Sequence, residues 1–439
     1  MLLRNTTRRI GIMMFWLLSM NVYAQHGYER LIKKYGVTEG LSQAVVNSIT
    51  QDKKGLMWFA TDDGFNRFDG YSFQAFRFDC QDTRFLHDNF VQRIFNDRDG
   101  DLWVSSRQGM YRFDLSTEQL FPFIDSTGVN RNDVSFITEE KKGHLWVAWY
   151  WGGFGLFDKK TKQYTAYNEG NLPLLTSTAT IVMHEDTYGL LWVGSQDKGL
   201  NVFESDAAKI MKRRNDLSSN DILPSLYIKC FQEDHFGNIW IGTTQGLVVY
   251  ARRDNRFHVV SAQGELDGKP VFSLKEDSDK TLWIGTRGHG LYAMSLKNYE
   301  GVWPDKLTVR QIGVVDRYDI SHHTILSIFE DNDKNIWLGT HGDGIFMIGN
   351  AAKKFTTIQT KIFSRSAERY VPYHGLCNDS DGNIWAGTDG EGIFQLNRNG
   401  EVIRRYTAGE HDSGLETDVF FTAYRDHEEN LWFGSYSDG

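Results

Sequence analysis

Apolar and polar positions along this chain follow one short pattern that returns nine times. An alternating run such as VVNSITQD (45–52), YIKCFQED (227–234) or TILSIFED (324–331) leads into a polar turn, and a second run such as LWVGS, IWIGT or LWIGT follows. Period-two alternation bounded by turn residues predicts β-strands. A Gly-rich second turn and a third strand come next. Each copy therefore predicts strand, tight turn, strand, Gly-rich turn, strand, and a more variable fourth strand.

A tryptophan marks the second strand of every copy. The nine residues are Trp58, Trp103, Trp146, Trp192, Trp240, Trp283, Trp337, Trp385 and Trp432. Their spacing matches the period of a four-stranded propeller blade rather than a leucine-rich or helical-pair repeat. One such sheet cannot bury both of its faces, but blades stacked in a ring can, with the tryptophan between neighbours. The predicted fold is all-β, a propeller of seven four-stranded blades followed by the start of a second propeller.

Three further positions recur around each tryptophan. Six residues before it stands aspartate, or glutamate in the Trp146 copy, and three residues before it stands glycine in six copies. This combination predicts a tight turn, because the Asp side chain can accept bonds from nearby backbone N–H groups and glycine can take a positive φ. Two residues after each tryptophan the side chain is small. We expect that position to let a neighbouring strand or blade approach closely.

The N-terminus predicts export. Three arginines, an apolar run (IGIMMFWLLSM) and the sequence Val22-Tyr23-Ala24 fit a signal peptide over residues 1–24, which places the mature chain in the periplasm. An uncleaved anchor is the alternative, although the apolar run is shorter than the ~20 residues that span a bilayer. Residues 25–352 are then the seven-bladed ring, and residues 353–439 are two further, incomplete blades. We expect Tyr28–Val37 to close the ring by pairing with the third strand of the seventh copy, around Gly344–Ile348.

Net charge and cysteine content argue against several classes of partner and site. The formal net charge of −9 is a poor match to nucleic acid, which calls for a basic patch. The three cysteines are Cys80, Cys230 and Cys377, and other copies carry serine or phenylalanine where Cys230 and Cys377 stand, so packing is their expected role. No C-x-x-C pair occurs, and neither a zinc site nor a disulfide framework is expected.

Three motifs that look chemical have simpler interpretations. The segments 97–101 and 379–383 resemble calcium loops, but glycine falls at the fourth position rather than the sixth, which favours a turn. His322-His323 lacks a third ligand placed by sequence. Gly152-Gly153-Phe154-Gly155 does not precede a helical pattern and therefore does not predict a phosphate site. No catalytic residue, metal site or cofactor is expected.

Ligands of propellers bind over one mouth of the channel, on loops that the ring holds in place. The Gly-rich second turns are expected to share that face, and the third copy departs from the others with an aromatic triplet. Aromatic faces suit sugar rings, and neighbouring Arg and His could bond hydroxyl or acidic groups. The candidate ligand-binding residues are Trp149, Tyr150, Trp151, Arg107, Arg287, His289, His341 and Asp343. The alternatives are that Trp149 and Trp151 pack against the next blade and that the Arg and His residues are solvated.

The repeats resemble the two-component regulator propeller family. The resemblance is carried by DKKGLMWFATDDGFNRFDGYSF (52–73), DHFGNIWIGTTQGLVVY (234–250), DSDGNIWAGTDGEGIFQL (379–396) and the lead-in GVTEGLSQAVVNSITQD (36–52). It implies the periplasmic sensor half of a hybrid two-component sensor of polysaccharide-degrading bacteria. In that family two seven-bladed rings usually precede a β-sandwich, a transmembrane helix and cytoplasmic kinase and regulator domains.

The chain departs from that plan because the ninth copy stops at Gly439, before its third strand, and no kinase motif is present. We therefore expect a truncated or split sensor, not an enzyme, that detects a carbohydrate or oligosaccharide. Its membrane contact would come only through the missing C-terminal part or an uncleaved N-terminal segment. Residues beyond about 360 should exchange amide hydrogens faster than the ring, unless a homodimer covers them. The alternatives are a propeller glycosidase or lyase using Asp62, Asp343 or Glu391, and a protein-interaction scaffold.

Overall fold

The computed structural model describes residues 32–77, 89–123, 133–172, 175–206, 209–214, 217, 221–260, 265–297, 299, 308–315, 318–350, 361–364, 367–370, 372–398, 400–410 and 413–436. The predicted signal peptide, Cys80 and residues 28–31 lie outside them. By its contacts the chain divides into two compact units, Met1–Ala351 and Ala352–Gly439. They are called unit 1 and unit 2 below, and each is considered by itself.

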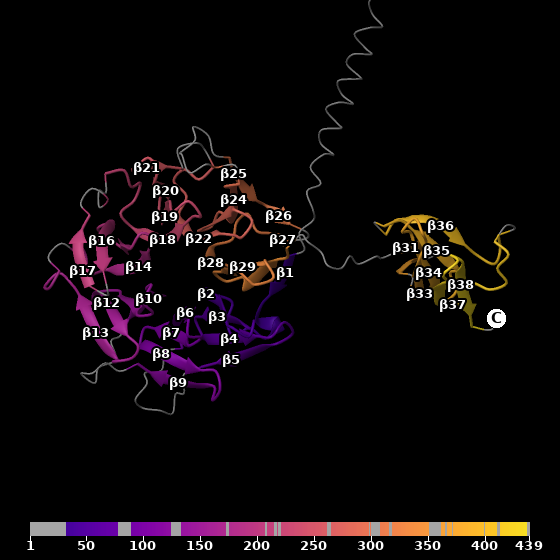
Figure 1. Ribbon diagram of the computed structural model, residues 1–439, viewed down its shortest axis with the longest axis horizontal. Coiled ribbons are helices and arrows are strands. Elements are labelled where there is room, and N and C mark those ends of the chain that lie inside the picture. The colour runs from indigo at the N-terminus through magenta and orange to yellow at the C-terminus, as the bar shows by residue number, and fades with distance from the viewer. Residues whose placement is uncertain are drawn as a thin grey trace, which may run out of the picture. The chain divides into compact units, whose positions relative to one another are not determined.

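Unit 1 contains seven four-stranded antiparallel sheets in its described residues, and Figure 1 shows them arranged around a ring. We number these blades from one to seven in the order of their tryptophans. In each blade the first strand of the repeat lies nearest the centre and the fourth lies outside (Figure 1). The predicted propeller fold is therefore confirmed.

The strand bounds of the blades are as follows. Blade one is β2 (Val46–Gln51), β3 (Met57–Thr61), β4 (Gly64–Phe68) and β5 (Phe73–Phe76). Blade two is β6 (Val91–Asn96), β7 (Leu102–Ser106), β8 (Gly109–Asp114) and β9 (Gln119–Pro122). Blade three is β10 (Val134–Glu139), β11 (Leu145–Trp149), β12 (Gly153–Asp158) and β13 (Gln163–Tyr167). Blade four is β14 (Thr180–Glu185), β15 (Leu190–Ser195), β16 (Leu200–Asp206) and β17 (Lys209–Arg213).

The remaining blades complete the ring. Blade five is β18 (Ile228–Glu233), β19 (Ile239–Thr243), β20 (Gly246–Ala251) and β21 (Arg256–Val259). Blade six is β22 (Val271–Glu276), β23 (Thr281–Thr286), β24 (Leu291–Ser295) and β25 (Val309–Ile312), and a short hairpin of β26 (Val314–Val315) and β27 (Tyr318–Asp319) follows it. Blade seven is β28 (Ile325–Glu330), β29 (Ile336–Thr340), β30 (Ile345–Ile348) and β1 (Ile32–Tyr35). One helical turn, η1 (Val37–Glu39), joins β1 to blade one.

The N-terminal strand closes the ring as the sequence predicts. β1 pairs antiparallel with β30, with Ile32 opposite Ile348 and Tyr35 opposite Ile345. The fourth strand of the last blade therefore comes from the beginning of the chain. Trp337 of blade seven then packs with Val46, Ile49 and Phe59 of blade one, so the first and last blades share one core cluster.

The repeat tryptophan of each blade of unit 1 is buried between its own blade and the next. Trp58 of blade one packs with Ile94 and Val104 of blade two, and Trp240 of blade five packs with Leu274 and Ile284 of blade six. The seven indoles are at most 3% exposed. Burying so much aromatic surface between sheets holds the blades together, because an exposed sheet face gains stability when apolar area leaves water.

A hydrogen bond from indole to carboxylate joins the tryptophan to its turn. In blade one Asp52 accepts bonds from the backbone N–H groups of Lys54 and Leu56 through one oxygen and from Trp58 Nε1, at 2.9 Å, through the other. The same indole bond occurs in every described copy that carries aspartate. In the exceptional copy Trp146 Nε1 donates instead to Glu185, and Glu140 binds His144. The predicted Asp turn is confirmed, and the aspartate also anchors the inter-blade core.

The position three residues before the tryptophan has a positive φ in all nine copies. Six copies have glycine there, with φ between 78° and 97°, whereas Lys280, Lys334 and Glu429 take φ of 64°, 64° and 72°. The left-handed region disfavours side chains other than glycine. The turn shape is therefore kept even where the sequence lacks glycine.

Polar contacts also connect adjacent blades. The glutamate that ends the innermost strand in several blades accepts a bond from the preceding blade's Asp turn, as Glu233 does from Thr187 N and Glu276 from His235 N. Gln51 makes the equivalent contact with Asn332 N, across the closure between blades one and seven. The closing contact thus repeats the ordinary contact between neighbours.

Unit 2 contains one four-stranded sheet of β33 (Tyr373–Asn378), β34 (Ile384–Thr388), β35 (Ile393–Leu396) and β36 (Val402–Tyr406). Two hairpins flank it, β31 (Lys361–Ser364) with β32 (Ala367–Tyr370) and β37 (Phe420–Arg425) with β38 (Leu431–Ser435). Its apolar surface is poorly covered, since Trp432 is 61% exposed and Tyr424 66% exposed, in contrast to the repeat tryptophans of unit 1. Faster hydrogen exchange beyond residue 360 remains a prediction that this exposure supports.

Candidate ligand-binding site

The second turns of the blades share one end of the ring. In five blades the glycine that ends this turn donates its N–H to the segment leading into the next blade's innermost strand: Gly64 to Asn89, Gly153 to Thr178, Gly199 to Leu226, Gly290 to His323 and Gly344 to Ala44. The turns therefore lie where the innermost strands begin. We call this end of unit 1 the mouth.

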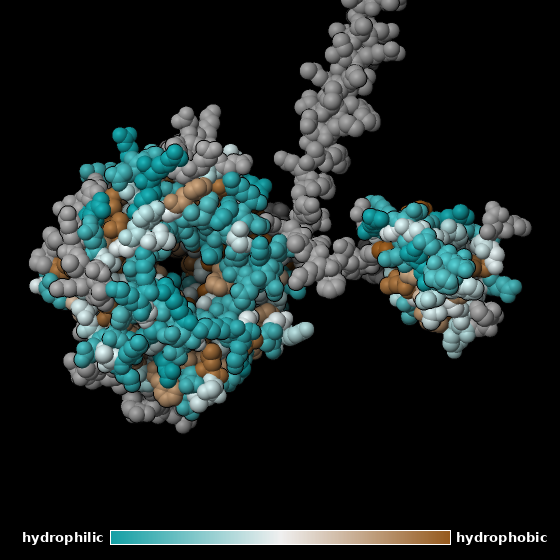
Figure 2. Space-filling view, viewed as in Figure 1, coloured by the Kyte–Doolittle hydropathy of each residue, from teal (hydrophilic) through white to brown (hydrophobic). Residues whose placement is uncertain are grey.

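A channel runs along the centre of unit 1. Its volume is about 690 Å³, and its walls are the seven innermost strands together with Tyr150 and Tyr227. Figure 2 shows an opening near the middle of this ring, within a largely hydrophilic face. A cavity of this volume falls within the range of small-molecule binding sites.

A β-bulge near the start of each innermost strand directs one side chain per blade into this channel. The pairing register shifts between Val46 and Ser48 in blade one and between Ile228 and Cys230 in blade five, with equivalent shifts in the other blades. The skipped residues, all of which line the channel, are Asn47, Gln92, Ser135, Ile181, Lys229, Phe272 and Leu326. A bulge of this kind changes the direction of a side chain. Here each blade thereby presents a different side chain to the channel at the equivalent position of its innermost strand.

Trp149 does not face the mouth, which corrects the prediction that it binds ligand. It is 3% exposed and lies at the end of β11 in a core cluster with Trp103 and Phe157. Gly155 leaves room for the indole, because a Cβ there would stand 3.0 Å from Trp149 Cη2. The packing alternative therefore holds for Trp149.

The other two aromatic residues of the triplet occupy different positions. Tyr150 lines the channel, and burial, followed by the charge of neighbouring Tyr227, raises the pKa of its hydroxyl, which stays protonated as a hydrogen-bond donor. Trp151 stands in the turn between β11 and β12 and is 71% exposed. Of the triplet, Tyr150 and Trp151 are thus available to a ligand.

The candidate charged residues lie at the mouth, and they differ in whether other side chains already bind them. Arg107, Arg287, His289 and His341 are exposed. Asp343 is bound by Lys34 at 3.2 Å and by His323 at 3.3 Å, so it mainly joins β1 to blade seven. The carboxylates considered for an enzyme also have partners, since Asp62 accepts from Asn47 and Glu391 pairs with Arg405.

The cysteines of the described residues have the expected environment. Cys230 packs against the core cluster around Trp240, and burial raises the pKa of its thiol to about 12. Burial also raises the pKa of Cys377. A thiol with a raised pKa is a poor nucleophile at neutral pH, and this supports packing as the role of both.

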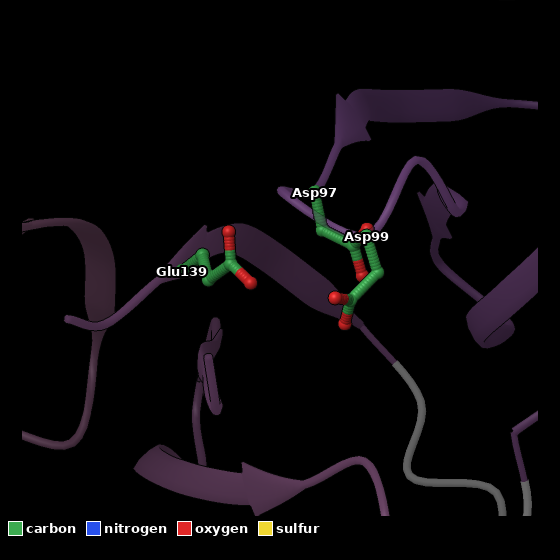
Figure 3. Close-up of side chains that lie close together, drawn as sticks. All are labelled: Asp97, Asp99 and Glu139. Atoms are coloured by element: carbon green, nitrogen blue, oxygen red, sulfur yellow. The ribbon is translucent and has the colours of Figure 1, made fainter. Parts of the chain in front are cut away.

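Asp97, Asp99 and Glu139 form a compact carboxylate group where the innermost strands of blades two and three end (Figure 3). Lys159 Nζ donates to all three, at 2.9, 2.6 and 3.0 Å. Although burial alone would lower the pKa of Lys159, these bonds raise it well above its usual value. The bond to Lys159 in turn lowers the pKa of Asp99. The ammonium group therefore occupies the position that a cation would take.

Replacing Lys159 by methionine should lower the free energy of unfolding by about 1–3 kcal/mol, because buried carboxylate oxygens lose their donor. The variant should also gain thermal stability from Ca²⁺, which prefers clustered carboxylate oxygens. Thermal melts with and without CaCl₂ test this, with the exposed Lys160→Met as control. Equal stabilisation of the wild type by Ca²⁺ would contradict the assignment of Lys159 as the resident cation.

Sequence interpretation missed three cationic residues of the channel wall, Arg93 on β6, Lys229 on β18 and Lys275 on β22. Arg93 offered a signal, because it stands ten residues before its tryptophan, where other copies have Ser48, Phe136 or Cys230. Because the residue at this position differs from copy to copy, an arginine there does not by itself indicate a binding site.

Comparison with known proteins identifies the repeat. A sequence profile described as the two-component regulator propeller matches residues 40–63, 86–108, 222–245, 265–288, 319–342 and 369–390. The chain contains two-component regulator propeller repeats. Each matched stretch but the last includes the bulge and the Asp turn of one blade of unit 1, so five of the seven innermost strands that line the channel lie within matched repeats. The curated histidine kinase P4 of Formosa agariphila is 37% identical over 79 residues, which are 17% of this chain and 6% of that protein.

Solved structures resemble this two-component regulator propeller over nearly its whole length. The extracellular domain of the hybrid two-component system BT3049 of B. thetaiotaomicron is 28% identical with a TM-score of 0.62, covering 93% of this chain and 52% of that one. That of BT4673 from the same organism is 19% identical with a TM-score of 0.59 and the same coverage. The chain therefore spans about half the length of these relatives.

A further structure shares the fold alone. Virginiamycin B lyase of Staphylococcus aureus is 12% identical with a TM-score of 0.54, covering 73% of this chain and all of that one. In the described part of the two-component regulator propeller no helix is long and apolar enough to cross a membrane.

Proposed function

We propose that this chain is the ligand-sensing part of a two-component receptor, exported to the periplasm, and that it detects a carbohydrate or oligosaccharide. Support comes from its likeness to the extracellular domain of a hybrid two-component system over 93% of the chain. The signal-like N-terminus agrees with the same location. Kinase output belongs to other segments of such a receptor, and this chain supplies recognition.

The observation that carries the proposal is the combination at the mouth of unit 1. An exposed indole at Trp151 adjoins Tyr150 on the wall of a channel of about 690 Å³. Indole and phenol rings stack on the apolar face of a sugar ring, while the channel's amide and hydroxyl groups suit sugar hydroxyls. Because these groups lie on a ring of packed sheets, they are held in place before a ligand arrives.

Replacing Trp151 by alanine should weaken oligosaccharide binding by ~1–3 kcal/mol, about 5-fold to 150-fold, as loss of a binding anchor does. The melting temperature should stay unchanged because the indole is 71% exposed. Binding is first surveyed on an array of neutral and acidic oligosaccharides and then measured by calorimetry.

The matched control is Tyr71→Ala, which removes an aromatic residue that is 97% exposed in the turn between β4 and β5. This variant should bind like the wild type. Failure of every arrayed oligosaccharide to bind, or equal loss of affinity in both variants, would count against the carbohydrate site. Cleavage of a bound oligosaccharide would favour the enzyme alternative instead.

A further inference from the structure

The channel of unit 1 is cationic although the chain is acidic. Arg93, Lys229 and Lys275 line it, and its lining residues, all within the described part of the chain, include no aspartate or glutamate. The chain as a whole has a formal net charge of −9. Three uncompensated cations inside a concave, low-dielectric wall attract anions, since field lines are focused in such a cleft.

Arg93 is held in place and has a donor to spare. Its guanidinium carbon lies 3.8 Å from the centre of the Phe136 ring, so stacking fixes the guanidinium group. Its Nε atom is buried and has no hydrogen-bond partner among the described residues. Burial lowers the pKa of Arg93 to about 10, and the group remains charged at neutral pH. An unmatched buried donor costs free energy that a ligand oxygen can recover.

The other cations have no carboxylate partner in the described residues. Lys229 donates only to the Tyr227 hydroxyl, at 2.9 Å, and lies 4.8 Å from the centre of the Phe272 ring. Lys275 also lines the channel and makes no hydrogen bond or ion pair with any other residue that the structure describes. Asn96 adds a buried Oδ1 atom that has no donor there, which suits a ligand hydroxyl. The wall thus offers charged donors and at least one free acceptor.

These groups stand at successive depths. We count residues along each innermost strand from its bulge, which lies nearest the mouth. Lys229 is the bulge residue itself, Arg93 is one residue past the bulge of its strand, and Lys275 is three residues past the bulge of its strand. At about 3.3 Å per residue the three levels span about 10 Å. This length matches about two sugar units, with Tyr150 at the mouth end of the same channel.

We propose that the channel binds an acidic oligosaccharide whose carboxylate or sulfate groups are held by Arg93, Lys229 and Lys275. The sugar part of this inference rests on the proposed function, whereas the anion site rests on the channel itself. The shared chemistry is an anionic oxygen group, for which a planar guanidinium and two ammonium groups are suitable donors.

The test uses the purified chain and three probes: trigalacturonate, its fully methyl-esterified form and a sulfated chondroitin disaccharide. Array binding should favour acidic oligosaccharides, and the two acidic probes distinguish carboxylate from sulfate. The methyl ester keeps the sugar backbone without its charge, and it should bind at least about 10-fold more weakly than trigalacturonate if the carboxylate is recognised.

Two variants remove channel charge, Arg93→Met and Lys275→Met, and each should reduce affinity for the bound acidic sugar about 10-fold to 100-fold. Arg93→Lys should retain part of the affinity because it keeps the charge. The control is Lys33→Met, which removes an exposed positive charge from the outer strand β1 and should leave binding unchanged. Circular dichroism and melting curves establish whether each variant is folded. If Arg93→Met does not fold, the binding affinity of Lys275→Met tests the proposal.

The outcomes separate the two proposals. Binding confined to neutral oligosaccharides would overturn the anion site and leave the sensor proposal standing. Equal affinity of an acidic oligosaccharide for the wild type and for both methionine variants would also overturn the anion site. If no oligosaccharide binds, the carbohydrate proposal fails. Inorganic sulfate then tests whether the channel contains an anion site. A sulfate-dependent rise in melting temperature that Arg93→Met abolishes supports the anion site, and its absence overturns the inference.

Discussion

Replacing Asp186 by alanine should lower the free energy of unfolding of unit 1 by about 3–5 kcal/mol, the range for breaking a buried ion pair. Asp186 is fully buried and accepts bonds from Tyr188 N, Leu190 N and Trp192 Nε1, each at 2.8–2.9 Å. It also pairs with Arg252, whose side chain is largely buried. Alanine leaves three donors and one guanidinium without their acceptor. Urea unfolding followed by circular dichroism measures the loss.

Unit 2 provides a matched control in Asp426. Its carboxylate makes the same bonds, to Glu428 N, Asn430 N and Trp432 Nε1, but Trp432 is 61% exposed. Asp426→Ala should therefore lower the free energy of unfolding much less than Asp186→Ala, because water replaces the lost acceptor. Similar losses in both variants would show that the turn bonds, rather than burial between blades, determine the contribution of this aspartate.

Replacing Trp149 by alanine should destabilise unit 1 by about 3–5 kcal/mol, as aromatic-to-alanine changes in protein cores do. The indole fills the space between blades two and three and packs against the Tyr164 ring, with centroids 5.6 Å apart. The loss should appear as a lower urea midpoint, while any ligand bound by Trp151 keeps its affinity in the folded protein. A stable variant with weakened binding would restore Trp149 as a ligand residue.

A second variant, Trp149→Thr, tests why this blade departs from the others. At the same position Thr61, Thr243 and Thr286 donate their hydroxyl groups to the carbonyl of the glycine that ends the second turn. Threonine in place of Trp149 should form this bond with Gly153 and recover about 1 kcal/mol relative to alanine. No recovery would mean that the third blade holds its turn differently.

The fold follows from the sequence because its signals are local and repeated. Each of the nine copies contains four positions at fixed spacings: an acid, a residue with positive φ, a tryptophan and a small residue. Each of these positions has one physical role. Even the ring closure was predictable, since Ile32–Tyr35 pairs with Ile345–Ile348 as expected. A blade needs a fourth strand, and the segment before the first repeat was available to supply it.

The candidate site was predicted less well, because its residues come from different copies. Trp149 and Trp151 are two residues apart, and strand alternation alone would give both the same direction. The chain leaves the strand at Trp149, and the turn carries Trp151 into solvent while the indole of Trp149 enters the core. The space beside Gly155 that accepts Trp149 cannot be seen in a linear pattern.

Sequence alone determined the repeat, the strand order within a blade, the Asp turn and the closure of the ring, because each depends on neighbours a few residues apart or on a strand that must be paired. The tertiary structure alone decided which side chains share the channel. Arg93, Lys229 and Lys275 come from blades two, five and six and meet only when those blades surround one axis. Local spacing fixes what a blade is, whereas the ring fixes which charges face one another.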